Sequence, residues 1–407
     1  MNILIVTQYF WPENFRINDL ARGLVERGHR VTVLTGLPNY PGGRFFAGYG
    51  ASGPWREAHE GIEVIRVPLL PRGGGGRTRL LLNYLSFALS ASLLGPWRVR
   101  AAADAIFVYE PSPITVGIAA AAMKRSKGAP LLFWVQDLWP ESLRATGAVR
   151  SAWLLALVGY LVRWIYRRCD LILVQSRAFI PTIEAASVPS DKIRYFPNSA
   201  ERVEAAPRDG EKDLFARIPD GFRILFAGNI GAAQDFPTIL RAAELARGEA
   251  PLRWIVVGDG RQAEWLREQI AARSLGDCVF LLGRHPLEAM PGFYAAADAL
   301  LVTLRRDPVF ALTVPSKLQS YLAAAKPVLA ALDGEGASIV EEAGCGYVAP
   351  TEAPEVLAAQ ALKMYRTAAQ DRARMGASGR TYFEANFERE RLLDNLERWL
   401  REAGACV

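Results

Sequence analysis

Residues 312–328, which read LTVPSKLQSYLAAAKPV, place a cation at the predicted start of a helix. Pro315 stands where a first helical residue is favoured, with Thr313 shortly before it. The first amides of a helix lack partners within it and carry partial positive charge. Ser316 adds a hydroxyl and Lys317 a full positive charge, so this segment could stabilise a departing diphosphate. The alternative is an ordinary surface helix with a solvated lysine.

Three glycine-containing loops follow successive predicted strands in the second half of the chain. Glycine permits positive φ and close approach of the backbone to a ligand, and the amides that open the next helix can bind phosphate oxygens. Any one loop could simply turn the chain, but three at successive strand ends indicate a nucleotide site. The candidate nucleotide-binding residues are Gly228 and Asn229, then Gly258, Gly260 and Arg261, and finally Gly283 and Arg284.

Asp137 follows an apolar predicted strand in the first half of the chain, with Trp139 and Glu141 close behind it. A carboxylate in this place can orient or deprotonate a hydroxyl group, and an indole offers a flat face to a sugar ring. We predict an acceptor site here, the alternative being that Asp137 caps the next helix. In the first βα loop, Asn14 and Arg16 are candidates for contact with phosphates or acceptor. Their alternatives are helix capping for Asn14 and a solvated position for Arg16.

The elements that must position these residues alternate between strands and helices. Short β-branched runs are separated by segments of helical spacing, which is the βαβ pattern of a parallel sheet. The pattern restarts near residue 222 and predicts an α/β fold of two Rossmann-like, doubly wound domains with a cleft between them. The predicted strands are 3–6, 31–34, 105–108, 131–135, 171–174, 223–227, 254–257, 279–282, 299–302 and 328–330.

The length of 407 residues exceeds what one core usually supports. We predict a first, membrane-facing and acceptor-binding domain over residues 1–200 and a nucleotide-sugar-binding domain over residues 201–380. Residues 381–407 form a last helix that could pack back on the first domain. A linker rich in Pro, Asp and Glu is expected over 197–220.

The charge of the chain is unevenly distributed. Residues 1–199 carry 23 Lys and Arg against 13 Asp and Glu, whereas residues 200–407 carry 25 against 29. A basic half indicates an anionic partner, and the arginines form no recognisable nucleic-acid motif, which favours a membrane surface. Neither the four cysteines nor the three histidines have ligand spacing, and no Asp-x-Asp pair ends a strand, so we expect no metal. The widely spaced cysteines and the absence of a signal-peptide pattern favour a reducing, cytoplasmic location.

Two apolar segments of the basic half lie between arginines. Residues 80–97 and 153–162 contain no charged residue. The first approaches the length of a membrane-spanning helix, and the second ends in arginines and aromatic residues, which suit a membrane interface. We expect both to dock at the cytoplasmic face of the inner membrane. The alternatives are buried crossover helices or, for the first segment, a true span.

Six segments together resemble retaining glycosyltransferases of family four, in the WbuB-like branch that builds bacterial surface polysaccharides. The resemblance covers nearly the whole chain and implies a GT-B fold, a UDP-linked donor sugar and retention of anomeric configuration. It is carried by Gln8–Glu13, Gly28–Gly36, Pro38–Gly43, Gln136–Ser142, Phe196–Asn198 and Pro315–Lys317.

The chain departs from that family at one place. Many members carry two glutamates separated by seven residues, the second of which holds the donor ribose. Here Leu312 and Ser320 occupy those positions. Ser320 stays a candidate donor-binding residue, and Gln319, Glu335 or Glu341 could replace the missing carboxylate.

The expected reaction is metal-independent and retaining. It transfers a hexose, of the N-acetylated amino or deoxy kind, from a UDP-sugar to a polyprenyl-diphosphate-linked saccharide, with no cofactor beyond the nucleotide sugar. Lys317 would stabilise the leaving diphosphate and Asp137 would position the acceptor. The alternatives are a non-catalytic membrane scaffold of transferase descent and a UDP-sugar epimerase or hydrolase.

Overall fold

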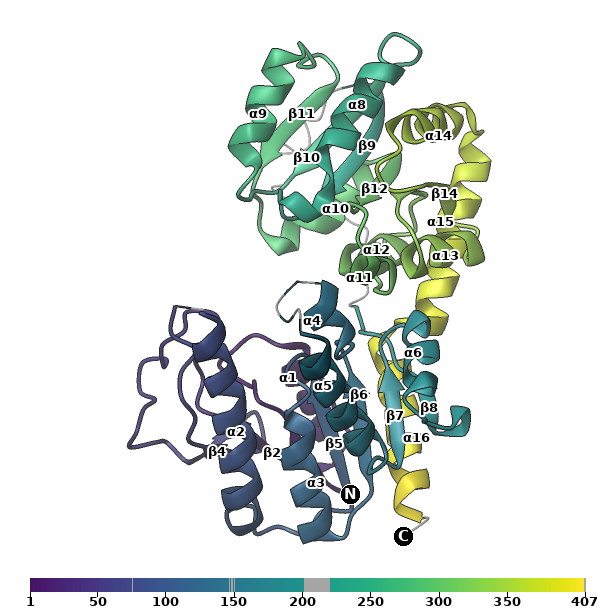
Figure 1. The fold of residues 1–407 in the computed structure, drawn as a ribbon. Coiled ribbons are helices and arrows are strands. Elements are labelled where there is room, and N and C mark those ends of the chain that lie inside the picture. Colours follow the sequence, from purple (N-terminus) through teal and green to yellow (C-terminus); the bar gives the residue numbers. More distant parts are fainter. Residues whose placement is uncertain (75, 146, 148, 150, 201–219, 406–407) are drawn as a thin grey trace. The chain divides into compact units, whose positions relative to one another are not determined.

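The computed structural model describes residues 1–74, 76–145, 147, 149, 151–200 and 220–405. They form two compact units, drawn as a ribbon in Figure 1. Unit 1 comprises Met1–Pro197 together with the chain from Leu392 onward, and unit 2 comprises Asn198–Arg391. Most of the expected linker, residues 201–219, lies outside the described residues.

Unit 1 is built on an eight-stranded sheet in the order β3-β4-β2-β1-β5-β6-β7-β8. The strands pair in parallel except for β3, which runs antiparallel to β4. Their bounds are β1 Asn2–Val6, β2 Arg30–Gly36, β3 Arg56–His59, β4 Ile62–Val67, β5 Ala105–Glu110, β6 Leu131–Val135, β7 Leu171–Val174 and β8 Ile193–Tyr195.

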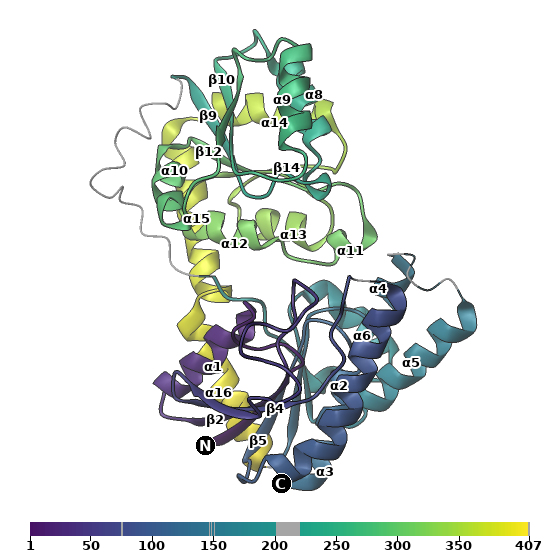
Figure 2. The ribbon, with the colours of Figure 1, turned by 90° about the vertical axis from the view of Figure 1, so that its left-hand side faces the viewer.

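Helices cover both faces of this sheet. Figures 1 and 2 agree that α2, α3 and α5 lie on one face and that α1 and α16 lie on the other. The helices are α1 Arg16–Glu26, α2 Arg77–Arg98, α3 Val116–Lys127, α4 Glu141–Ala145, α5 Ala152–Tyr166, α6 Ile180–Ala185 and α16 Arg389–Ala405.

The C-terminal segment does not form the single helix predicted over residues 381–407. Helix α15 (Ala369–Asn386) runs through the predicted start of that segment and belongs to unit 2. Only from Leu392 onward does the chain pack in unit 1, where Leu396 and Leu400 of α16 join the core formed by β1, β5 and α1. Leucines spaced by four residues share one helix face, which explains this packing.

Unit 2 contains a fully parallel six-stranded sheet in the order β11-β10-β9-β12-β13-β14. Its hydrophobic interior is divided by the sheet into two clusters, one beneath α8 and α14 and the other beneath α10, α12, α13 and α15. The strands are β9 Phe222–Ala227, β10 Leu252–Val257, β11 Val279–Gly283, β12 Ala299–Thr303, β13 Val328–Ala331 and β14 Gly346–Ala349. The helices not yet given are α8 Phe236–Ala246, α9 Ala263–Ala272, α10 Met290–Ala296, α11 Pro308–Ala311, α12 Ser316–Ala323, α13 Glu335–Glu342 and α14 Pro354–Arg366.

Each sheet has a point at which the strand order reverses. In unit 1 it lies between β1 and β5, and in unit 2 it lies between β9 and β12. Parallel α/β sheets bind ligands beyond the carboxyl ends of their strands at such points. The loops that follow β1, β5 and β9 are therefore the places where each unit is expected to bind a ligand.

The apolar helix α2 is neither fully buried nor fully exposed. It is long and apolar enough to cross a membrane, the one helix of the described residues for which this holds, and 28% of its most apolar window is buried. Asn83, Phe87, Ala91 and Gly95, spaced by four residues, are buried. The opposite side exposes Leu81, Leu85, Leu89 and Leu93. The alternative of a fully buried crossover helix is therefore wrong for α2, because one of its faces is exposed.

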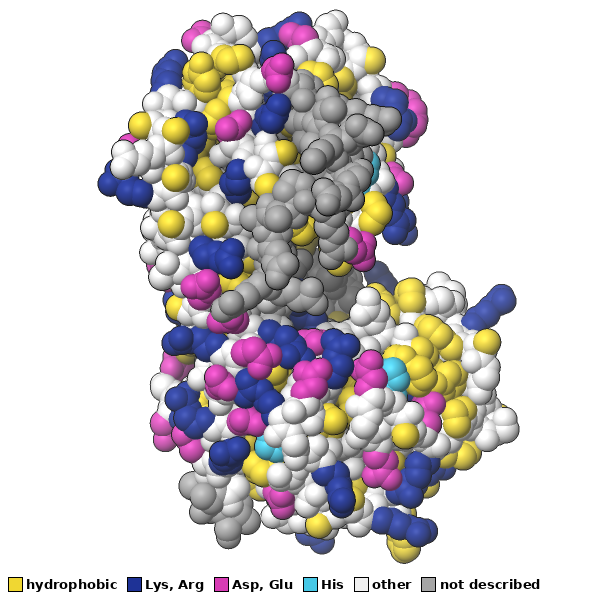
Figure 3. Space-filling model, turned by 180° about the vertical axis from the view of Figure 1, so that it is seen from behind, with side chains coloured by type: hydrophobic (Ala, Val, Ile, Leu, Met, Phe, Trp, Pro, Cys, Tyr) yellow, Lys and Arg dark blue, Asp and Glu magenta, His cyan; other side chains and the backbone are white. Residues whose placement is uncertain are grey.

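Helix α5 has the same character. Leu155, Val162 and Ile165 are buried, whereas Trp153 and Leu157 are exposed. Figure 3, which views the molecule from behind, shows that hydrophobic side chains also gather along one edge of unit 1. Apolar surface that is contiguous and exposed marks an interaction site more often than a solvated face.

Candidate functional site

In unit 2, two glycine loops pack directly on each other beyond β9 and β10. A Cβ atom on Gly258 would lie 1.8 Å from the carbonyl oxygen of Gly228, and one on Gly260 would lie 2.3 Å from that of Ile230. Gly228 and Gly258 also have φ values of 146° and 145°, which side chains disfavour. These glycines are therefore required by the close approach of the two loops, and not only by the turns.

A buried tyrosine fixes the end of β9 just before these loops. The hydroxyl of Tyr321 on α12 accepts a hydrogen bond from the amide of Ala227 at 2.9 Å, and the side chain is fully buried. The bond joins α12 to the residue that precedes Gly228. The start of α12 and the first glycine loop are thus held in one arrangement.

Lys317 lies against this first glycine loop. A Cβ atom on Gly228 would be 3.0 Å from the Lys317 Nζ. The Nζ lies 3.7 Å from the ring centroid of Phe226 and donates a hydrogen bond of 2.5 Å to the Oε1 of Gln234. Burial lowers the pKa of Lys317 to about 7, because desolvation disfavours the charged amine. The alternative of an ordinary surface lysine does not fit this half-buried environment.

The start of α12 differs by one residue from the sequence prediction. Pro315 is the N-cap, in an extended conformation, and the first helical residue is Ser316. The hydroxyl of Thr313 donates to the carbonyl of Phe310 within its own turn. Ser316 is exposed and Ser320 is half-buried. The extended Pro315 leaves the amides of the first turn of α12 without a side-chain cap.

A cavity of about 500 Å³ opens beside the glycine loops. Gly228, Asn229, Gly258, Gly260 and Arg284 all line it, as the sequence pattern predicts. The exposed Arg284 forms no ion pair with any residue that the structure describes. Its charge is therefore available to an anionic ligand.

Of the residues predicted in the glycine loops, Gly283 and Arg261 stand outside that cavity, as do Lys317 and the other predicted residues at the start of α12, whereas the polar residues Asp259 and His285 line it unpredicted. Gly283 accepts the backbone hydrogen bond of Gly258 at 2.8 Å, and Arg261 lies exposed on the next turn. Asp259 and His285 line the cavity. The Oδ1 of Asp259 accepts the amide of Gly260 at 2.8 Å.

The residues suggested as replacements for the missing glutamates are placed differently. Gln319 is buried and donates to the carbonyl of Asn198 at 2.6 Å, so it holds the chain at the start of unit 2. Glu335 opens α13, and Glu341 is exposed near its end. None of the three lines the cavity, whereas Asp259 does. The position of Asp259 between two glycines was the available sequence signal for it.

In unit 1, Asp137 lies in the turn between β6 and α4. Its carboxylate accepts hydrogen bonds from the hydroxyl of Ser142 and, at 3.2 Å, from the Nε1 of Trp139. Burial raises its pKa despite these donors. Asp137 precedes α4 by four residues and is not its N-cap. The side chains that bind it come from the same turn (Trp139) and from the first turn of α4 (Ser142), and together they orient the carboxylate at the end of β6.

A second buried acid stands beside Asp137 at the end of the neighbouring strand. Glu110 is the last residue of β5, is fully buried, and neither of its carboxylate oxygens has a hydrogen-bond partner of ordinary geometry. Burial and the charge of Asp137 raise its pKa well above the usual value. Sequence reasoning missed Glu110, because only the order of β5 and β6 in the sheet brings it next to Asp137.

An aromatic group follows β1 in the same unit. The rings of Tyr9 and Phe15 stack at 5.0 Å, and Tyr40 packs against Phe15 at 5.2 Å. The guanidinium of Arg72 lies 5.0 Å from the Tyr40 ring and donates to the Tyr9 hydroxyl at 3.1 Å. Aromatic faces beside a cation suit a ligand with both sugar rings and negative charge.

Asn14 and Arg16 flank this aromatic group. Asn14 is exposed and does not cap α1, since the N-cap is Phe15. Arg16 is the first residue of α1 and is exposed, as the alternative of a solvated position requires, although partial desolvation lowers its pKa. Tyr109, the residue before Glu110, is close enough to oppose that shift.

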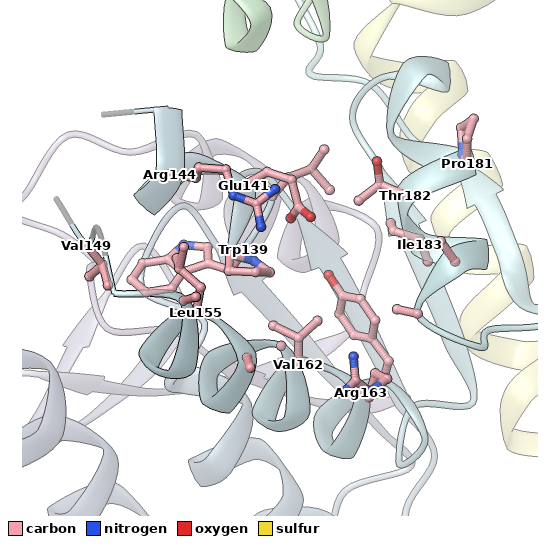
Figure 4. Close-up of a pocket in the computed structure, with 18 residues that line it drawn as sticks. Trp139, Glu141, Arg144, Val149, Leu155, Val162, Arg163, Pro181, Thr182 and Ile183 are labelled. Carbon is pink, nitrogen blue, oxygen red and sulfur yellow. The ribbon is translucent and has the colours of Figure 1, made fainter. Parts of the chain in front are cut away.

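A larger cavity of about 940 Å³ lies between α4, α5 and α6 of unit 1 and is shown in Figure 4. Trp139 and Glu141, both predicted acceptor-site residues, line it. No group of three or more His, Cys, Asp or Glu side chains with metal-binding geometry occurs among the residues described.

Comparison with protein families matches the two halves of the chain separately. Residues 14–199 match the glycosyl transferase 4-like domain, and residues 221–367 match the glycosyl transferases group 1 family. The two matched segments coincide closely with the two units of the structure.

Curated relatives are glycosyltransferases. The chain is 30% identical over 245 residues to "Probable glycosyltransferase WbjE" of Pseudomonas aeruginosa, which covers 58% of this chain and 60% of the relative. It is 26% identical to "Putative colanic acid biosynthesis glycosyl transferase WcaI" of Escherichia coli strain K12, over 79% of this chain and 81% of the relative.

Solved structures show the same fold over the whole length. HepE of Anabaena, solved in complex with UDP, superposes with a TM-score of 0.70 at 15% identity and covers 99% of this chain and 100% of its own. Together with two parallel-sheet units and the two family matches, this fold is GT-B. The chain is a glycosyltransferase of the GT-B fold, with a glycosyl transferase 4-like first domain and a group 1 second domain.

Proposed function

We propose that the enzyme transfers a sugar from a UDP-linked donor to a polyprenyl-diphosphate-linked saccharide, with retention of configuration and without a metal ion. The observation that carries the proposal is the position of the half-buried Lys317 amine against Gly228, at the start of α12. A cation beside free helix amides and a glycine loop is suited to the charge that develops on a leaving diphosphate.

The donor site lies in unit 2. The amides of the first glycine loop and of the start of α12 would bind the two phosphates, and Lys317 would neutralise them. Arg284 and Asp259 line the adjoining cavity and would contact the nucleoside, with Asp259 accepting from ribose hydroxyls in place of the missing glutamate. The UDP bound to HepE supports a uridine nucleotide, and the sugar is of the N-acetylated amino or deoxy kind.

The chemical step follows from retention without a carboxylate nucleophile. The bond between the anomeric carbon and the diphosphate oxygen breaks, while the acceptor oxygen bonds to the same face of that carbon. The acceptor proton passes to the departing diphosphate oxygen. Lys317 and the loop amides stabilise the negative charge as it forms, and Asp137 orients the acceptor hydroxyl.

From the exposed apolar surface of unit 1, we infer that the acceptor is attached to a lipid. Leu89, Leu93 and Trp97 on α2 are 63%, 61% and 83% exposed, which is unusual for side chains of this size. Arg77 and Arg79 at the start of α2 are exposed as well. A partly buried helix with leucines outward and arginines at its end is typical of a helix that lies in a membrane interface. This surface supports our proposal that the enzyme works at the cytoplasmic face of the inner membrane.

The biological role that we propose is synthesis of a bacterial surface polysaccharide such as an O-antigen, capsule or exopolysaccharide. The name of the relative WcaI assigns that protein to colanic acid biosynthesis. A lipid-linked acceptor and a membrane-facing first domain agree with such a role.

The proposal is tested first on the donor. A thermal-shift panel compares UDP-, GDP- and dTDP-sugars. A ligand that binds only the folded protein raises its free energy of unfolding, by about 2.7 kcal/mol at 100 times the Kd. UDP-sugars should raise the melting temperature of the wild type more than the others, and Lys317→Ala should reduce that rise. An equal or larger shift with GDP-sugars would contradict the UDP assignment.

A further inference from the structure

The 940 Å³ cavity of unit 1 has the size of a binding site. Pockets for small organic ligands are usually about 300–1,000 Å³, and this one lies at the upper end. Figure 4 shows that it is bounded by α5 on one side, and by the turn that carries Trp139 and by α6, which carries Ile183, on the others.

Its walls are largely apolar. Leu155 and Val162 on α5 and Ile183 on α6 line it with buried side chains. Gly159 lies between them on α5, and a Cβ atom there would meet only the Cγ of Pro140 at 4.0 Å and the guanidinium of Arg163 at 3.6 Å. The cavity therefore continues between α5 and Pro140, where a side chain would otherwise stand.

One side of the cavity is polar. The Oε2 of Glu141 is buried without a hydrogen-bond partner, and the exposed guanidinium of Arg144 forms no ion pair among the described residues. Figure 4 places both side chains together on the α4 side. Trp139, which also lines the cavity, donates its indole N–H to Asp137. The polar side is thus continuous with the candidate acceptor carboxylate.

The opposite surface of α5 is also apolar. Trp153, Leu157 and Tyr160 are 69%, 57% and 57% exposed and face away from the cavity lining. A ligand that lies along the inner side of α5 could therefore pass from the cavity towards this apolar surface, past the exposed Arg163, which also lines the cavity near the end of α5. Two cations, Arg144 on α4 and Arg163 on α5, line this otherwise largely apolar cavity, which suits an amphiphile with an anionic head group.

We propose that this cavity binds the first isoprenoid units of the acceptor, with the diphosphate against Arg144 and a hydroxyl of the first sugar donating to Glu141. The inference rests on the proposed function, because it names the part of the acceptor that unit 1 recognises. Phospholipid acyl chains are the competing occupant, and the diphosphate distinguishes the two.

The first experiment measures binding without turnover. A photoreactive farnesyl diphosphate is crosslinked to the full-length chain, and the labelled peptides are mapped by mass spectrometry. Label should appear between residues 138 and 166 and should be displaced by farnesyl diphosphate more effectively than by farnesol or inorganic diphosphate. Label confined to other segments, or equal displacement by farnesol and a phospholipid, would overturn the proposal.

A matched pair of variants on α5 tests the position. Ala156 lines the cavity and is exposed, whereas Leu157, the next residue, does not line it. Ala156→Trp should weaken binding of the farnesyl diphosphate probe by about 10-fold or more, because excluding even two methylene groups from an apolar site costs that much. Leu157→Trp should bind it as the wild type does, and Ala156→Leu provides a milder substitution if the tryptophan disturbs folding. Equal affinity of wild type, Ala156→Trp and Ala156→Leu would exclude this cavity.

Kinetics separates this inference from the proposed function. With a long-chain lipid-linked acceptor, Ala156→Trp should raise KM about 10-fold at unchanged kcat, and with a water-soluble acceptor lacking the isoprenoid chain it should change neither. Absence of transfer by the wild type to any lipid-linked acceptor would instead reject the proposed function. Wild-type transfer with identical KM values for both variants would reject only the lipid site.

Discussion

The Nζ of Lys317 lies 3.7 Å from the ring centroid of Phe226, which is the next-to-last residue of β9, just before the first glycine loop. The amine is held there by the Oε1 of Gln234 at 2.5 Å and has no carboxylate partner among the described residues. A half-buried amine without a counter-ion is stabilised in its charged form when an anion binds next to it. We infer that the donor diphosphate completes it.

Replacement of Lys317 by alanine should lower kcat by about 100-fold, the scale seen when one preorganised charge-stabilising group is removed. The measurement is steady-state sugar transfer with purified protein. Lys326→Ala is a useful control, since its amine donates to backbone carbonyls of Ala295 and Ala297 and serves the fold of unit 2. A folded Lys317→Ala enzyme with near wild-type turnover would be incompatible with the assigned role.

The binding of UDP should take up a proton at about pH 8. Burial lowers the pKa of Lys317 to about 7 in the free protein, and a bound diphosphate raises it again, so the amine is neutral before binding and charged after it. The terminal phosphate of UDP, with a pKa of about 6, is already ionised. UDP affinity should therefore fall as the pH rises above about 7. Calorimetry in buffers of different ionisation enthalpy measures the uptake, which should be absent in Lys317→Met.

The same pKa determines how Lys317 affects folding. Because its folded pKa lies below the value of 10.5 in an exposed lysine, the group opposes folding when charged, below about pH 7. That opposition disappears as the pH rises from about 7 towards 10.5.

The prediction for UDP binding has a clear contrary outcome. A proton release on UDP binding, or a UDP affinity that increases with pH, would show that Lys317 does not face the diphosphate.

Replacement of Gly258 by alanine should abolish most UDP binding. The new Cβ would lie 1.8 Å from the carbonyl oxygen of Gly228 at a φ of 145°, so both loops must move apart, at a cost on the order of 1–3 kcal/mol for the strained backbone alone. Gly276→Ala is the matched control, because no atom lies within 4 Å of its Cβ. Isothermal calorimetry compares the two variants, and equal UDP affinities would contradict the role of the paired loops.

Membrane binding should depend on α2 and on salt. The double variant Leu89→Glu with Leu93→Glu puts charged residues on the outer face of α2 and should prevent flotation with liposomes that contain acidic lipid. Each leucine that is buried in the membrane contributes about 1.5–3 kcal/mol to the free energy of binding. Leu287→Glu, at an exposed leucine of unit 2, should have no effect. Binding of the wild type should weaken with added salt, which screens charges beyond about 8–10 Å. If the wild type floated equally well with liposomes of neutral lipid, electrostatic attraction would not contribute to membrane binding.

Much of the fold could be predicted from the sequence because each signal is local. The apolar runs at 3–6, 131–135 and 254–257 are strands of the structure within a residue or two, since buried parallel strands need continuous apolar residues. The residues Gly228, Gly258 and Arg284 follow strand ends directly, so their common cavity follows from the parallel direction of the strands. The transferase family matches leave the scaffold and epimerase alternatives without support.

The remaining features depend on long-range packing that local patterns do not encode. Glu110 reads as the end of an ordinary strand, and only the adjacency of β5 and β6 brings it to Asp137. Arg66 is fully buried, yet nothing near it in the sequence indicates that its guanidinium bonds Glu57 and the carbonyls of Gly36 and Trp11. The exact start of α12 was likewise misplaced, because proline is compatible with both the cap and the first helical position.

The most direct test of the reaction is the structure of its product. Purified enzyme is incubated with a UDP-sugar and a polyprenyl-diphosphate-linked saccharide in excess EDTA, and the anomeric configuration of the new linkage is read by NMR. Our account predicts full activity under EDTA and the same anomeric configuration in product and donor. An inverted linkage, or activity that EDTA abolishes and Mg²⁺ or Mn²⁺ restores, would contradict it.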